Sequence, residues 1–126
     1  MEVIQNVLIA KGTLNEVQAY PRLVAEAALR TNAHSVILCH NHPGGSVIPS
    51  QQDLDMTADL GRMLQGLEIA LVDHVVVAGE ETLSMVECGL LIHGSANGHQ
   101  LTRVADSGSD VLIARRVEEW KRKRNK

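Results

Sequence analysis

The sequence predicts a single α/β domain, in which a sheet and its flanking helices form two or three layers. Two features of the chain indicate this class. Runs rich in Val, Ile and Leu are typical of strands, and they alternate with segments whose apolar residues recur at helical spacing. In addition, 44% of the 126 residues are hydrophobic, so a chain of single-domain length can build a core.

The N-terminal part of the chain favours two strands, a helix and a third strand. Residues 2–10 are rich in Val, Ile and Leu, and residues 14–20 alternate weakly and favour a shorter strand. Pro21 suits the first turn of a helix, and an apolar stripe at helical spacing follows it. Residues 35–39 form a continuous apolar run, so we expect a buried central strand there.

The middle of the chain favours a loop, a helix and further strands. Residues 41–49 predict a loop because of their Pro and Gly content. Ser50 can cap a helix that ends at Gly66. Residues 67–78 are strongly β-prone and favour one bent strand or two short ones, and residues 82–86 favour a last strand.

The C-terminal part differs in composition from the rest. Residues 92–110 are rich in Gly, Ser, Asn and His, and this composition predicts a loop or flexible linker. Residues 111–124 can form a helix with Ile113, Val117 and Trp120 on one side.

The net charge of −3 conceals a basic C-terminus. Residues 115–126 carry seven Lys or Arg and two Glu, a balance of +5, which leaves −8 on the remaining residues. An acidic body is a poor surface for nucleic acid, and the absence of Phe argues against a base-stacking platform. The basic tail could bind phosphate or an acidic partner, but a solvated helix end is the simpler interpretation.

The chain also carries signals about its cellular compartment. Its two cysteines are far apart in dissimilar contexts and do not suggest a disulfide framework. No apolar run is long enough to span a membrane, and the start Met1-Glu2-Val3 does not resemble a signal peptide. We therefore expect a cytoplasmic protein without a membrane partner.

His40 and His42 are the first candidates for chemistry. They lie two residues apart at the end of an apolar run, and alternate side chains of a strand lie on one face, so both could point the same way. Asp53 lies in the first turn of the helix that Ser50 opens. Two imidazoles and a carboxylate are a plausible ligand set for Zn²⁺, with the fourth tetrahedral position left for water.

Each of these residues also has a simpler structural interpretation. A histidine in a core is more often a packing residue with a satisfied hydrogen bond, so spacing alone leaves metal binding by His40 and His42 open. The sequence Ser50-Gln51-Gln52-Asp53 is similar to a capping box, in which the Asp side chain reaches back to the cap. On spacing alone, the cap is the favoured role for Asp53.

Asp73 and His74 form a further candidate pair inside an apolar strand. Burial of such a pair costs free energy unless both side chains are hydrogen-bonded. The pair could orient a zinc ligand from outside the ligand set, and an ordinary structural hydrogen bond is an equal alternative.

Several short motifs follow one another along the chain: Gly12-Thr13-Leu14, Tyr20-Pro21-Arg22, His40-Asn41-His42-Pro43-Gly44-Gly45, Pro49-Ser50-x-x-Asp53 and Asp73-His74. In this order they resemble the RadC family of bacterial JAMM-domain proteins, from about Val7 to Leu91. The resemblance implies an α/β JAMM (MPN) fold, similar to cytidine deaminase, with a sheet flanked by helices over residues 1–91. Residues 92–126 would then be a linker and a basic helical tail.

The resemblance also implies a chemistry. A JAMM domain is a zinc-dependent metallohydrolase that cleaves peptide or isopeptide bonds in a protein or peptide substrate. By the same resemblance, His40, His42 and Asp53 would hold the zinc, and Ser50 would steady the tetrahedral intermediate as a catalytic residue.

The sequence departs from the family pattern at one point. The family places a general-base glutamate well upstream of Gly12-Thr13-Leu14, and neither Glu2 nor Glu16 aligns with it. We therefore expect the chain to lack the first strand of the domain, which would expose a sheet edge for pairing with a second copy. The alternative function is a non-catalytic module for DNA repair or protein interaction, with a structural or vacant metal site and DNA as a partner.

Overall fold

The computed structural model describes residues 20–42, 44–96, 99–105 and 108–124. The strands expected over residues 2–10 and 14–20 lie outside this part of the chain, except for Tyr20, which begins a helix instead. The described elements are α1 (Tyr20–Arg30), β1 (Ser35–Asn41), α2 (Gln51–Gly66), β2 (Ala70–Ala78), β3 (Glu81–Ser84), β4 (Leu91–Ala96), β5 (His99–Val104) and α3 (Asp110–Arg124). This mixture of helices and strands confirms the predicted α/β class.

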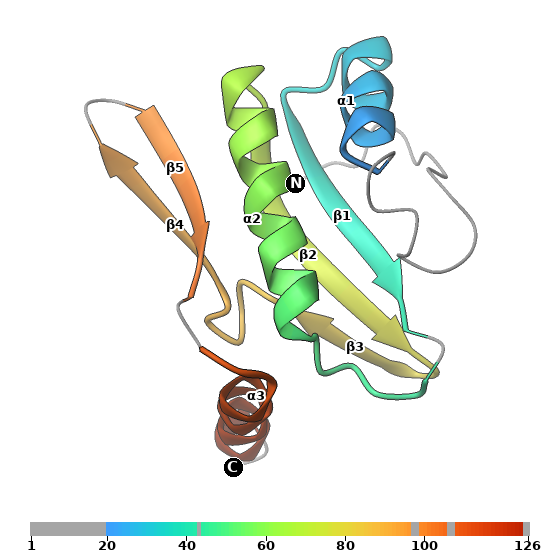
Figure 1. Ribbon diagram of the computed structural model, residues 1–126, viewed down its shortest axis with the longest axis vertical. Coiled ribbons are helices and arrows are strands. Elements are labelled where there is room, and N and C mark those ends of the chain that lie inside the picture. Colours follow the sequence, from blue (N-terminus) through green and yellow to red (C-terminus); the bar gives the residue numbers. More distant parts are fainter. Residues whose placement is uncertain (1–19, 43, 97–98, 106–107, 125–126) are drawn as a thin grey trace.

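The main sheet has the strand order β1-β2-β3 among the described residues. β1 and β2 are parallel and are joined by α2, which packs across the sheet, while β2 and β3 form an antiparallel pair (Figure 1). A parallel crossover brings the helix back to the start of the next strand. The amino end of α2 is therefore close to the carboxyl end of β1, where the candidate ligands lie.

The core lies between α2 and this sheet. Three leucines of α2, Leu54, Leu60 and Leu64, are fully buried at the helical spacing that the sequence predicts. The helix ends at Gly66, as expected, and the predicted strands over residues 67–78 and 82–86 are present as β2 and β3.

β1 confirms the strand predicted over residues 35–39, but its predicted burial is wrong. Its burial alternates along the strand, and Ile37 remains 45% exposed. A continuous apolar run does not show whether both faces of a strand are covered. The other side of the strand faces the common core, where Leu38 is buried.

The prediction of a linker over residues 92–110 is also wrong, because the structure has a β-hairpin there. β4 and β5 pair antiparallel from Leu91–Val104 to Ala96–His99. Nε2 of His93 donates to the Val72 carbonyl oxygen at 2.7 Å and joins the hairpin to β2. Polar composition alone therefore does not distinguish a linker from a hairpin.

The predicted C-terminal helix is confirmed as α3, and it packs onto the common core. Ile113 and Val117 are fully buried in the same cluster as residues of α2 and β2. On its surface, Lys121 forms an ion pair with Glu81 of β3 at 3.1 Å. None of the helices in the described residues is long and apolar enough to cross a membrane.

Candidate metal centre

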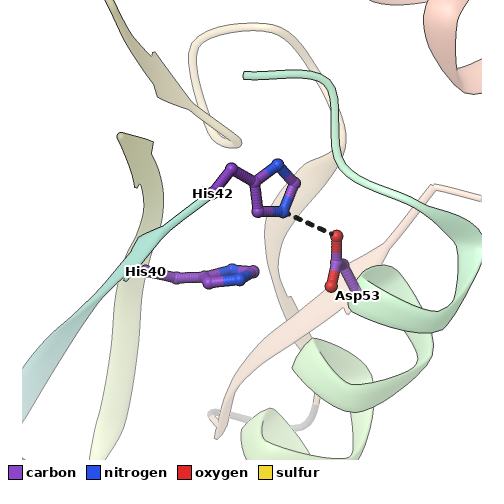
Figure 2. Close-up of side chains that lie close together, drawn as sticks. All are labelled: His40, His42 and Asp53. Carbon is purple, nitrogen blue, oxygen red and sulfur yellow. Dashed lines mark hydrogen bonds and ion pairs between the residues drawn. The ribbon is translucent and has the colours of Figure 1, made fainter. Parts of the chain in front are cut away.

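The three predicted ligands lie together at one end of the sheet. His40 and His42 project from the end of β1, and Asp53 faces them from the first turn of α2 (Figure 2). One nitrogen of each imidazole and one carboxylate oxygen all lie within 4.8 Å of one another. The strand alternation and the crossover thus produce the arrangement that the spacing predicts, while metal binding itself remains a prediction.

His42 is oriented by a hydrogen bond to the main chain. Its Nδ1 lies 2.8 Å from the Ser46 carbonyl oxygen, and because a carbonyl only accepts, Nδ1 carries the proton and donates. Nε2 then faces Oδ2 of Asp53 at 3.1 Å. A cation between them would be bound by both the Nε2 lone pair and the carboxylate oxygen. The site therefore suits a metal ion.

Asp53 forms the predicted helix cap and also faces the two histidines. Its amide donates to the Ser50 hydroxyl oxygen at 3.1 Å, and its Oδ2 accepts from the Ser50 amide at 2.8 Å, which completes a capping box. The side chain is nearly buried, and the same oxygen faces His42. The capping hydrogen bonds therefore hold the carboxylate beside the histidines, so the cap and the place in the cluster are compatible.

His40 lies on β1 and packs against His42, which follows the end of the strand. The two rings meet edge to face, with centroids 4.5 Å apart and an interplanar angle of 84°. Burial lowers the pKa of His40 below its ordinary value of 6.5, with His42 acting in the same direction and the Asp53 carboxylate opposing it. A neutral imidazole is the form that binds a metal ion.

Asp73 and His74, which were predicted as a pair, lie on opposite faces of β2. Asp73 accepts hydrogen bonds from the Ser84 hydroxyl and from the Val86 amide at 3.1 Å. It therefore holds the end of β3 and the residues that follow it in place. The structure does not bring Asp73 into the cluster. His74 points the other way, is fully buried, and its ring centroid lies 5.7 Å from that of His40.

Burial also sets the charge of His74. It lowers the pKa to about 4, and the nearby His40 acts in the same direction. The ring is therefore neutral at neutral pH. Its Nδ1 lies 2.7 Å from the hydroxyl oxygen of Thr57, a fully buried side chain of α2.

Sequence reasoning missed two residues that support the site. Thr57 lies four residues after Asp53 and hence on the same face of α2, a signal that was available in the spacing. Asp110, in the first turn of α3, accepts a hydrogen bond from the Gln51 amide at 2.6 Å. Fifty-nine positions separate these two residues, and no local pattern connects them.

Asp110 caps the first turn of α2 from outside the helix, through the amide of Gln51. Replacing Asp110 with Ala should lower the free energy of unfolding by about 1 kcal/mol, because this end cap is lost. Urea unfolding would measure the change, and hydrogen exchange at the Gln51 amide should accelerate. Glu119→Ala, an exposed acid on the same helix, is the control, and an equal loss in both variants would contradict the capping role.

An α/β domain that gathers two histidines and an aspartate around one point is a candidate metalloprotein. A family model described as the RadC-like JAB domain matches residues 1–90 of the chain. The chain therefore belongs to the RadC-like JAB domain family, as the sequence motifs indicated.

Curated relatives from three bacteria agree with this assignment, and each carries the name UPF0758 protein. The relative from Bordetella petrii is 49% identical over 83 residues, which are 66% of this chain and 37% of the relative. That from Cupriavidus pinatubonensis is 52% identical over 81 residues, or 64% and 36% of the two chains. That from Pseudomonas syringae pv. tomato is 45% identical over 84 residues, or 67% and 38%. The matched region thus spans little more than a third of each relative.

Proposed function

We propose that this chain is a zinc-dependent hydrolase that cleaves a peptide or isopeptide bond. The observation that carries the proposal is the convergence of His40, His42 and Asp53, with ligand atoms within 4.8 Å of one another. Nitrogen and carboxylate donors suit zinc, and three protein ligands are the number found in catalytic zinc sites. A zinc ion held there would supply the Lewis acidity that activates water and polarises a carbonyl at neutral pH.

The residues around the cluster have separate tasks in this proposal. His42 is fixed by the Ser46 carbonyl, and Asp53 by the Ser50 cap, so two of the ligands need little reorganisation. The Ser50 hydroxyl accepts from the Asp53 amide and keeps its own hydrogen for donation. Beside the cluster, that hydrogen can stabilise the oxyanion that forms when an amide carbonyl is attacked.

Metal content is the direct test of this proposal. Elemental analysis after zinc loading and desalting should find about one zinc per wild-type chain, in keeping with a single cluster. The His40→Ala/His42→Ala double variant should lose it, because only one of the three ligands remains. His34→Ala/His93→Ala removes two histidines outside the cluster and should keep the metal. Zinc retained by the first variant, or absent from the wild type, would overturn the proposal.

The hydrolase part is tested with the zinc-loaded chain and a mixture of quenched fluorescent peptides and isopeptides. We expect cleavage that a chelator abolishes and added zinc restores. Ser50→Ala should slow cleavage by about a hundredfold or more if the hydroxyl acts on the oxyanion. Stoichiometric zinc without any cleavage would reject the hydrolase and support a structural role for the metal.

A further inference from the structure

Two buried nitrogen atoms beside the candidate metal centre lack a hydrogen-bond partner. They are Nδ1 of His40 and Nε2 of His74, the buried side-chain atoms without a partner in the part of the chain that the structure describes. The two rings are 5.7 Å apart between centroids and tilted by 39°. An unpartnered buried nitrogen costs free energy, so the presence of two at one place needs a physical reason.

The proton on His74 can be assigned from its neighbours. The Thr57 hydroxyl lies 2.8 Å from the Asp53 carbonyl oxygen and donates to it, because a carbonyl only accepts. The hydroxyl oxygen must then accept from Nδ1 of His74, which lies 2.7 Å away. Since Nδ1 carries the proton of this neutral ring, Nε2 of His74 carries a lone pair and is a hydrogen-bond acceptor.

The proton on His40 follows from metal binding. The Nδ1 atom of His40 is buried, and a ligand that is reached by substrate and water binds through its more accessible nitrogen, here Nε2. Nε2 must then be unprotonated, and Nδ1 becomes a donor. A buried donor on His40 and a buried acceptor on His74 then lie on neighbouring rings, whose centroids are 5.7 Å apart.

We propose that His74 is a positioning residue for the metal centre and accepts a hydrogen bond at Nε2 from Nδ1 of His40 when His40 binds the metal. This inference rests on the proposed zinc site. A centroid separation of 5.7 Å is a few tenths of an ångström larger than that of two imidazole rings joined by a hydrogen bond of roughly 3 Å, so a small approach and rotation of the rings completes the bond. Metal-binding histidines generally donate their second ring nitrogen to such a partner, as His42 does to Ser46.

The resulting chain of hydrogen bonds begins and ends at ligands. It runs from the Asp53 carbonyl through Thr57 and His74 to His40, and thereby ties the ligand on α2 to the ligand on β1 through β2. Each bond fixes the donor and acceptor roles of the next. Loss of the Thr57 hydroxyl would leave Nδ1–H of His74 without an acceptor. It would then favour the tautomer with the proton on Nε2, which cannot accept a hydrogen bond from Nδ1 of His40.

The test compares the zinc affinity of Thr57→Val with that of Thr57→Ser, measured by competition with a chromophoric chelator. Thr57→Val keeps the volume and removes the hydroxyl, and we expect zinc to bind about ten- to a hundredfold more weakly. Thr57→Ser retains the hydroxyl and should bind zinc like the wild type. In the zinc-loaded wild type, the ring N–H of His40 should give a protected NMR resonance, which Thr57→Val should lose.

A control separates positioning from general stability. Leu64→Ala, at the far end of α2, empties a fully buried site without touching the hydrogen-bonded chain. It should lower the free energy of unfolding and leave the zinc affinity unchanged. If Leu64→Ala weakens zinc binding as much as Thr57→Val, or if Thr57→Val binds like the wild type, the inference is wrong and the zinc site stands. A wild-type chain that binds no zinc would overturn both.

Discussion

Replacing Ile113 with Ala is expected to lower the free energy of unfolding by about 2–4 kcal/mol. Ile113 is fully buried in the common core although it lies beyond the matched family region, which ends at residue 90. Truncation removes apolar contacts and leaves a cavity that the neighbours fill only in part. A loss of this size is a large fraction of the stability of a small domain. Urea unfolding followed by circular dichroism would measure it.

Leu112→Ala is the matched control on the same helix. Leu112 is 46% exposed, so its truncation should change the free energy of unfolding by less than about 0.5 kcal/mol. The two substitutions have similar effects on helix propensity, and the difference between them reports burial. Equal small effects would mean that α3 does not pack on the core as described.

Acidification of the metal-free chain should destabilise it through His74. The pKa of this ring is about 4 in the folded chain because of burial, against an ordinary value of 6.5. Between these pH values the unfolded chain binds more protons than the folded one, so the free energy of unfolding falls as the pH falls. The contribution is intact above pH 6.5 and decreases by about 3 kcal/mol on approach to pH 4.

The contribution of His74 is isolated by comparing the wild type with His74→Leu. Urea unfolding is measured for both between pH 7 and pH 4, and the variant should show the shallower dependence on pH. His34→Leu removes an exposed histidine and should reproduce the wild-type slope. If His74→Leu loses stability with acid as steeply as the wild type, His74 is not the group responsible.

Local patterns predicted the cluster because its geometry depends on short-range rules. A spacing of two on a strand placed His40 and His42 on one side, and a spacing of three from the cap placed Asp53 in the first helical turn. The same alternation on β2 places Asp73 and His74 on opposite faces, and their role in orienting a zinc ligand stays a prediction. The family assignment rested on the order of these motifs and is confirmed.

The missed features depend on contacts between distant parts of the chain. The burial of β1 depends on what covers its second face, which an apolar run does not specify. The hydrogen bond from Gln51 to Asp110 and the packing of Ile113 form only when α3 returns to α2. Composition was misleading in the hairpin, where the polar side chain of His93 forms a hydrogen bond to the neighbouring sheet.

The hairpin and α3 also determine where this chain can be shortened without disrupting its core. The family region ends at residue 90, while Leu90 and Leu91 are buried in the cluster that contains Val117 of α3. A fragment cut at that boundary would expose apolar surface and leave the Gln51 amide without its carboxylate. The end of the family match and the end of the packed core therefore differ, and fusions or excised domains of this chain should retain residues through 124.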